Sequence, residues 1–170
     1  MRFFFEKKDK SNRAVVEQII LERYNQFYRL AYSYVHNEAD AYDIVQNGAY
    51  KALRGSHTLK TPEYAGTWVY RIMLNECYSC LQQRKYGFSS CEELQEETGN
   101  EVGGREDTYA DVDLQRALDG LPPQDKAIVL LKYFEDKTLE EIAEIFDENV
   151  NTVKSRLYRS LKKLRGVLSA

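Results

Sequence analysis

The sequence is poor in the residues that interrupt or cross-link a fold. Its 170 residues include 3 prolines, 9 glycines and 3 cysteines. An odd number of cysteines argues against the disulfide framework of a small secreted protein. No apolar run reaches the length that spans a bilayer, and the opening MRFFFEKKDK lacks an apolar segment of signal-peptide length. With 43% hydrophobic and 30% charged residues, the composition indicates a soluble protein with a core, which we expect in the cytoplasm.

Residue patterns that are typical of catalysis are also missing. The sequence has no glycine-rich phosphate loop, no histidine beside a nucleophile and no carboxylate cluster suited to magnesium. Cys77 and Cys80 have the spacing of a metal or redox pair, with Cys91 nearby. Zinc, however, needs about four ligands, and His36 and His57 are both distant in sequence. A thioredoxin-like pair needs a βαβ context that is not predicted. We therefore expect no enzyme, no cofactor and no metal, and a buried apolar role for Cys77.

The formal net charge of −3 is unevenly distributed along the chain. Residues 1–86 contain 13 basic and 9 acidic residues, and residues 114–170 contain 10 and 9. Residues 87–113 contain 1 basic and 9 acidic residues, and they show no apolar periodicity. Such a segment cannot bury enough apolar surface to fold alone. It predicts a flexible acidic linker, so the overall charge says little about the partners of the flanking parts.

Helical periodicity dominates both flanking segments, and strand-like alternation is nearly absent. Before the linker, apolar residues recur at steps of three and four in residues 12–36, 40–53 and 64–85, which predicts three helices. Residues 54–63, which contain Gly55 and Pro62, form a predicted loop.

After the linker, shorter helices are predicted over residues 114–121 and 125–135, separated by Pro122-Pro123 and with Phe134 expected inside. Together with the two helices that follow, they make a four-helix domain. We predict an all-α protein of two small helical domains, 1–86 and 114–170, joined by the linker 87–113.

Residues 138–165 have the pattern of two helices around a tight turn. Thr138 and Glu141 form a T-x-x-E capping box, and Asn149 can cap the second helix. The second helix has one apolar stripe, and residues 150–170 contain six Lys or Arg and no Asp or Glu. A helix that is apolar on one side and cationic on the other, entered by a short turn, is typical of a DNA-recognition helix. The alternative is an amphipathic helix whose charged face merely meets water.

Four motifs follow one another along the chain: DAYDIVQ (40–46), GTWVYRIMLN (66–75), LPPQDKAIVLL (121–131), and EIAEIF with NTVKSRLYRSLKKLR (141–165). In this order and spacing they resemble a bacterial sigma factor of the short, two-domain extracytoplasmic-function (ECF) group. The resemblance implies a promoter-specificity subunit that directs transcription initiation and is not an enzyme. The implied partners are core RNA polymerase, promoter DNA and an anti-sigma factor, which is often membrane-anchored. No small-molecule substrate is implied.

In this family the first motif docks on the clamp coiled coil of the largest polymerase subunit. The resemblance assigns core binding to Asp40, Asp43, Ile44, Gln46 and Tyr50. Acidic residues beside apolar ones suit a partner helix that is partly cationic and partly apolar. The alternative is that Asp40 caps the helix and Asp43 adds a favourable charge to its first turn, and both can hold together.

The second motif corresponds to the helix that melts and contacts the minus-ten promoter element. Aromatic rings beside cations suit unpaired bases, because each stacked base contributes about 1–3 kcal/mol. The loop 54–63 is implied to help trap a flipped base. The alternative for Trp68 is that it packs in the core and does not contact a base. Ser79 stands where the family usually has Asp, and Gln82 where it has Arg, which points to an unusual promoter preference. The predicted minus-ten residues are Trp68, Tyr70, Arg71, Asn75, Tyr78, Ser79, Gln82, Arg84 and Lys85.

The last motif corresponds to the helix that enters the major groove of the minus-thirty-five element. Asp147 and Asn151 stand where the family often has Gly, and Asp tolerates the left-handed geometry of the turn. Cations here mainly hold phosphates, whereas Ser155 and Arg159 are the candidates for base edges. The predicted minus-thirty-five residues are Asn151, Thr152, Lys154, Ser155, Arg156, Tyr158, Arg159 and Lys162.

Two other functions are compatible with a helix-turn-helix. One is a stand-alone transcriptional regulator with a sensing domain, but a receiver needs alternating strands and helices that residues 12–85 do not show. The other is a nucleic-acid-modifying enzyme, which the sequence does not equip with a catalytic site.

Overall fold

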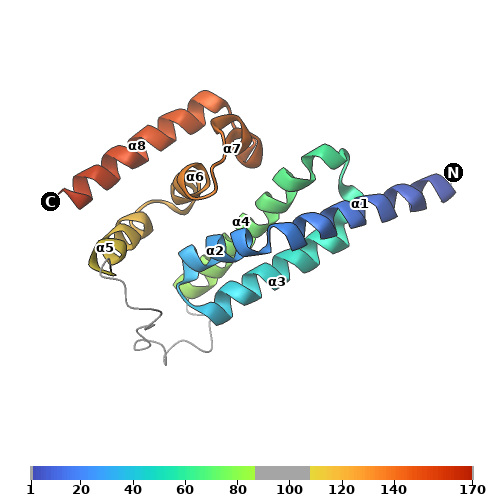
Figure 1. The fold of residues 1–170 in the computed structure, drawn as a ribbon, viewed down its shortest axis with the longest axis horizontal. Coiled ribbons are helices and arrows are strands. Elements are labelled where there is room, and N and C mark those ends of the chain that lie inside the picture. The colour runs from blue at the N-terminus through green and yellow to red at the C-terminus, as the bar shows by residue number, and fades with distance from the viewer. Residues whose placement is uncertain (1, 87–107, 170) are drawn as a thin grey trace.

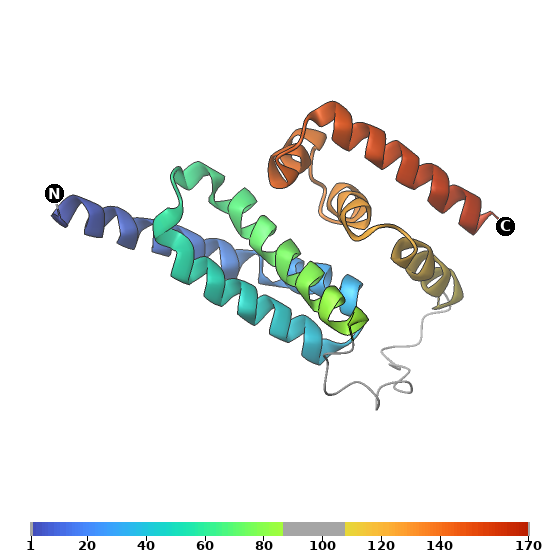
Figure 2. The same cartoon turned by 180° about the vertical axis from the view of Figure 1, so that it is seen from behind.

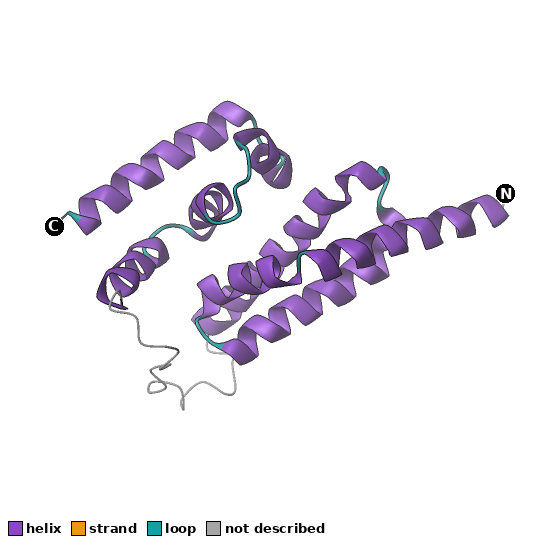
Figure 3. Ribbon diagram, in the orientation of Figure 1, coloured by secondary structure: helices purple, strands orange, loops and turns teal. Residues whose placement is uncertain are grey.

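The structure, a computed structural model, describes residues 2–86 and 108–169. Within these residues there are eight α-helices, two short 3₁₀ helices and no strand (Figure 3). The all-α prediction is therefore confirmed, and the described part of the chain gives no support to a receiver domain. The helices are α1 (Arg2–Glu22), α2 (Tyr24–Val35), α3 (Glu38–Gly55), η1 (Ser56–Thr58), η2 (Pro62–Tyr64), α4 (Ala65–Lys85), α5 (Thr108–Asp119), α6 (Pro123–Tyr133), α7 (Leu139–Phe146) and α8 (Val150–Leu168).

The N-terminal helices α1 to α4 pack around one apolar core (Figure 1). Each of them contributes a side chain with almost no exposed surface, namely Val16, Phe27, Val45 and Val69. These residues belong to the apolar stripes that the three- and four-residue spacing predicts. The core is thus formed by the inner faces of four helices, which leaves an outer face of α3 and of α4 for other contacts.

The C-terminal helices form a second group, in which α6 contacts both α7 and α8. Ile128 and Leu131 of α6 are fully buried, together with Ile142 of α7 and Val153 of α8. Helices α6 and α7 lie between α8 and the N-terminal group (Figures 1 and 2). The C-terminal group thus contacts the N-terminal group through α5, α6 and α7 and keeps one side of α8 open.

The predicted first helix, residues 12–36, is wrong in its length and continuity. Helix α1 begins ten residues earlier, at Arg2, and a break at Arg23 separates it from α2. Neither proline nor glycine marks this position, so tertiary packing sets the break. The Arg23 guanidinium lies 2.9 Å from the point that a Cβ on Gly66 would occupy, and 5.9 Å from the centre of the Tyr70 ring. The break therefore lets the side chain of Arg23 lie along the first turns of α4.

Three further boundaries differ from the sequence prediction. Helix α3 begins at Glu38 instead of Asp40, because the Asn37 side chain caps it by accepting a hydrogen bond from the Asp40 amide at 2.8 Å. Helix α5 begins at Thr108, six residues before the predicted domain boundary, while the remaining linker residues 87–107 lie outside the described residues. Phe134 follows the end of α6 and is exposed, so its predicted place in the core is wrong.

The helix-turn-helix forms as its capping residues predict. The Glu141 amide donates to Thr138 Oγ1 at 3.1 Å, and the Thr138 amide donates to Glu141 Oε2 at 2.7 Å. This hydrogen bond from the Thr138 backbone lowers the pKa of the Glu141 carboxyl. Asp147 takes the left-handed conformation with φ 52° and closes α7, and the Asn149 side chain accepts from the Asn151 amide at 2.8 Å. These local hydrogen bonds and the left-handed Asp147 thus shape the turn between α7 and α8.

Gly48 provides a test of how closely α3 approaches α4. A Cβ at this position would lie 2.4 Å from the Met73 sulfur, inside the core. Gly48→Ala gains about 1 kcal/mol of helix propensity, but overpacking costs about 1–3 kcal/mol, so we expect a net loss of stability. Gly166→Ala is the matched control, since nothing lies within 4 Å of its Cβ, and it should stabilise the protein slightly. Urea unfolding of both variants tests this, and a Gly48→Ala protein as stable as Gly166→Ala would contradict it.

Candidate nucleic-acid and polymerase interfaces

Helix α8 presents a polar outer face, opposite the buried side chains of Val153, Leu157 and Leu164. Its basic residues have no acidic neighbour on the same helix, because residues 150–168 contain no Asp or Glu. The side chain of Arg159 is 72% exposed, and the Lys154 ammonium lies 5.9 Å from the centre of the exposed Tyr158 ring. Seven of the eight predicted minus-thirty-five residues are exposed on this face: Asn151, Thr152, Lys154, Ser155, Tyr158, Arg159 and Lys162.

Arg156, the eighth predicted residue, has a different environment. Its guanidinium forms ion pairs with Asp125 and Glu148, each at 2.8 Å, and also bonds Gln124 at 3.2 Å. The side chain is only 16% exposed. In this structure Arg156 therefore ties α8 to the start of α6 and to the turn, and its charge is balanced within the protein.

Helix α4 divides the predicted minus-ten residues between its core and its surface. Tyr70 is 1% exposed and packs edge-on against Phe27, with ring centres 4.9 Å apart. Its hydroxyl donates to Gln26 at 3.2 Å, and burial raises its pKa to about 12. Tyr70 is therefore a core residue, and its ring is not open to a base in this arrangement. The predicted residues that are exposed on α4 are Asn75, Ser79, Gln82 and Lys85.

Two predicted cations of α4 are held by other parts of the protein. The Arg71 side chain donates to the Ile145 carbonyl at 2.8 Å and to the Glu144 carbonyl, at the C-terminal end of α7. The Arg84 side chain donates to the Val35 carbonyl at 3.1 Å and pairs with the Asp40 carboxylate. Burial alone raises the pKa of Asp40, but hydrogen bonds from Asn37 and Arg84 outweigh burial and lower it.

Some of the residues predicted for the two promoter elements line one groove. The groove has a volume of about 530 Å³. Gln82 and Lys85 of α4 line it together with Arg156 and Arg159 of α8. The sequence alone does not predict this juxtaposition, because it depends on how the two groups of helices pack.

A second cavity, of about 310 Å³, lies beside the loop that joins α3 to α4. Leu59, Lys60 and Thr61 of this loop line it together with Trp68 and Arg71 of α4. Trp68 is partly buried, so it packs against the core and still forms part of the cavity wall. Glu144 and Asp147 at the end of α7 complete the lining, so the hollow combines an aromatic ring, a guanidinium and a lysine with two acidic residues.

The face of α3 predicted to bind polymerase is largely exposed. Asp43, Gln46 and Tyr50 are exposed, whereas Asp40 is half-buried beside Arg84. Ile44 is buried in the core, so it supports α3 from inside and does not face a partner. Tyr42, which the sequence analysis did not single out, is also exposed on this helix. The signal available in the sequence was an aromatic residue directly before the acidic Asp43.

The cysteines of α4 differ in burial. Cys77 is buried, as predicted, and burial raises the pKa of its thiol to about 12. The thiol is therefore neutral at physiological pH. Cys80 is half-buried, and Cys91 lies outside the described residues.

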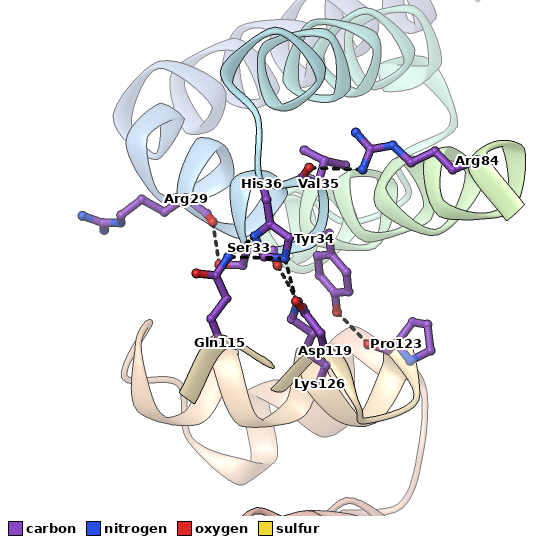
Figure 4. A network of polar contacts seen from close by, with 10 residues as sticks. All are labelled: Arg29, Ser33, Tyr34, Val35, His36, Arg84, Gln115, Asp119, Pro123 and Lys126. Carbon is purple, nitrogen blue, oxygen red and sulfur yellow. Dashed lines mark hydrogen bonds and ion pairs between the residues drawn. The ribbon is translucent and has the colours of Figure 1, made fainter. Parts of the chain in front are cut away.

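A polar network, missed by the sequence analysis, connects α2 with α5 and α6 (Figure 4). The Lys126 side chain is 5% exposed; its ammonium pairs with Asp119 at 2.5 Å, donates to the Ser33 carbonyl and lies 4.6 Å from the centre of the Tyr34 ring. The Tyr34 hydroxyl donates to the Pro123 carbonyl at 2.6 Å, and His36 lies 2.8 Å from Asp119. These contacts join the two groups of helices by directed polar interactions.

Tyr34 makes the stability of this packing dependent on pH. Burial, followed by the neighbouring Tyr78, raises the pKa of Tyr34 well above its usual value of about 10. The folded state favours the neutral phenol, so its contribution is complete below about pH 10 and is lost as the pH rises further. Tyr34→Phe should lower stability by about 1 kcal/mol at neutral pH and should make the alkaline loss less steep. Urea unfolding between about pH 8 and pH 11 measures both, and an equally steep loss in Tyr34→Phe would contradict the assignment.

Arg156 and Arg159 should differ in their effect on stability. Arg156→Ala leaves the buried Asp125 carboxylate without its main partner, so we expect a loss of about 1–3 kcal/mol. Arg159→Ala removes an exposed side chain and should change stability by less than about 0.5 kcal/mol. Thermal unfolding of the two variants tests the difference. Equal melting temperatures would show that the Arg156 ion pairs do not hold the domain together.

Comparison with known proteins places both groups of helices in described families. Residues 19–86 match the model for Sigma-70 region 2, and residues 111–164 match the model for Sigma-70, region 4. No helix among the described residues is long and apolar enough to cross a membrane.

Individual proteins match over most of the chain. The chain is 44% identical to RNA polymerase sigma factor SigV of Bacillus subtilis (strain 168), over 94% of each chain. It is 29% identical to ECF RNA polymerase sigma factor SigE of Mycolicibacterium smegmatis, over 90% of this chain and 61% of that protein. The fold resembles that of the sigma factor RpoE from Bartonella quintana in complex with the anti-sigma factor NepR, with a TM-score of 0.67 and 22% identity over 91% and 96% of the two chains. These matches show that the chain belongs to the ECF family of RNA polymerase sigma factors.

Proposed function

We propose that this protein binds core RNA polymerase and directs it to promoters, acting as a binding subunit and not as an enzyme. The observation that carries this proposal is that one chain contains both sigma-70 modules, over residues 19–86 and 111–164. A single module would contact only one promoter element. Two linked modules raise each other's effective concentration on one DNA, provided that their separation matches the spacing of the elements.

The outer face of α8 is the proposed contact with the minus-thirty-five element. Its cations suit phosphates, and the polar residues in its first turns are small enough to approach base edges. Arg159 is the strongest candidate for a base contact, because it is the arginine of this face whose side chain is open to solvent. In the described arrangement Arg156 instead connects α8 to Asp125 of α6 and to Glu148 of the turn.

The exposed face of α4 and the neighbouring loop are the proposed contact with the minus-ten element. The cavity lined by Leu59, Lys60, Trp68 and Arg71 offers an aromatic ring and cations to one unstacked base once Glu144 and Asp147 at the end of α7, which also line it, have moved away. Arg71 is engaged by the end of α7, and residues of both DNA surfaces line one groove. We therefore expect the two groups of helices to move apart when the protein engages a promoter.

The remaining partners follow from the same assignment. The face of α3 with Asp43, Gln46 and Tyr50 is the proposed contact with the clamp helices of polymerase, and it combines carboxylates with an exposed aromatic. An anti-sigma factor is the proposed regulator, because RpoE of Bartonella quintana, with a similar fold, forms such a complex. We place the protein in the cytoplasm, where polymerase is found.

Transcription by core polymerase on promoter DNA tests the proposal. The wild-type protein should make initiation start at defined sequences. Arg159→Ala should reduce initiation at a cognate promoter by about tenfold or more, as expected for a lost bidentate base contact, without changing binding to core polymerase. Arg165→Ala, another exposed arginine of α8 outside the predicted contact set, is the matched control. Unchanged initiation with Arg159→Ala would refute the base contact, and no sequence-specific start with the wild type would refute the function.

A further inference from the structure

We propose that Asn12 of α1 positions the loop between α3 and α4 and thereby sets base discrimination at the minus-ten element. Asn12 lies before residue 19, where the match to Sigma-70 region 2 begins. The inference rests on the proposed function for its consequence, but the geometry of Asn12 is independent of that function.

Asn12 is one of few polar residues in the core, with 2% of its surface exposed. Its Nδ2 group donates to the Leu59 carbonyl at 2.9 Å and to the Ser56 carbonyl at 3.3 Å. Both acceptors are backbone groups of the loop, 47 and 44 residues away in sequence. One amide therefore fixes two points of the loop backbone at once.

The other side-chain hydrogen bonds of this loop are local. Ser56, His57 and Thr58 each bond a carbonyl three residues earlier, at the end of α3. Such bonds shape the 3₁₀ turn but do not hold it against the rest of the domain. Within the described residues, Asn12 supplies the side-chain hydrogen bonds that reach residues 56–61 from a helix distant in sequence, and this helix packs against the loop.

The arrangement favours positioning over simple packing. The Asn12 Oδ1 atom is buried and has no hydrogen-bond partner among the residues that the structure describes. A buried acceptor without a partner is unfavourable, so an apolar side chain would fill the same space with less loss. Unlike an apolar side chain, the Asn12 side-chain amide donates two hydrogen bonds to carbonyls of the loop. Leu59, whose carbonyl accepts one of them, also lines the cavity with Trp68 and Arg71.

The test compares Asn12→Leu with Val16→Ala. Asn12→Leu keeps a similar volume but removes both donors, and Val16→Ala removes buried packing one turn further along α1. Hydrogen exchange on the protein alone should show faster exchange in residues 56–61 for Asn12→Leu, including the Leu59 amide that bonds the Ser56 carbonyl. Val16→Ala should not show faster exchange confined to this loop. Unchanged exchange in Asn12→Leu would overturn the positioning role.

A second experiment measures promoter opening in the presence of core polymerase, by permanganate reactivity. It compares a cognate promoter with promoter variants that carry single substitutions in the minus-ten element. Asn12→Leu should reduce the ratio of cognate to substituted opening at one position by about fivefold, comparable to one lost hydrogen bond. Val16→Ala should keep the wild-type ratio even where it lowers the melting temperature more. Equal ratios for all three proteins, or losses that follow thermal stability, would overturn the proposal. A wild type without any sequence-specific opening would refute the proposed function and leave the exchange result standing.

Discussion

Helix α4 has to pack against the core with one face and keep the opposite face exposed. Most of the structure depends on this division of its residues between the two faces. Its buried residues, Val69, Tyr70, Met73 and Cys77, join it to α1, α2 and α3. Its exposed residues, from Asn75 to Lys85, carry the amides and the cation proposed for DNA. Gly48 and Gly66 allow the close approach of neighbours that this burial needs, because each leaves the space that a Cβ would fill. A shift of α4 by part of a turn would exchange these two faces.

Several directed polar contacts join the two groups of helices, besides the apolar packing that runs through both. The Lys126 ammonium is buried among a carboxylate, a carbonyl and an aromatic ring, and Arg71 binds the carbonyls at the end of α7, where the helix dipole is negative. Polar contacts of this kind are easily replaced by water or by phosphate groups, unlike an apolar interface. The same arginine can therefore serve the packed arrangement and, after separation, a nucleic-acid backbone. This gives a physical reason why one chain can be stable alone and still open on a larger assembly.

Much of the fold could be predicted because its signals are local. The capping box at Thr138 and Glu141, the left-handed Asp147 and the cap at Asn149 depend on residues close in sequence, and the structure confirms each of them. The contacts of Arg23 and Tyr70, the Arg156–Asp125 ion pair and the Lys126–Ser33 hydrogen bond join residues 31 to 93 positions apart, so no periodicity indicates them. The resemblance assigned site residues to α3, α4 and α8, but it did not separate exposed residues such as Gln82 from buried ones such as Tyr70 and Ile44. Asn12 was missed because a polar residue in a helical pattern normally indicates the solvent side.

The central claim is that α4 and α8 act on two separate places of one DNA within the polymerase complex. Site-specific photocrosslinking tests this most directly, with a photoreactive side chain placed at Gln82 or at Ser155, both of which are exposed. The account predicts that the probe on α4 marks the minus-ten region and that the probe on α8 marks the minus-thirty-five region of the same promoter. Crosslinks from both probes to one position, or crosslinks from either probe that do not depend on the promoter sequence, would contradict it.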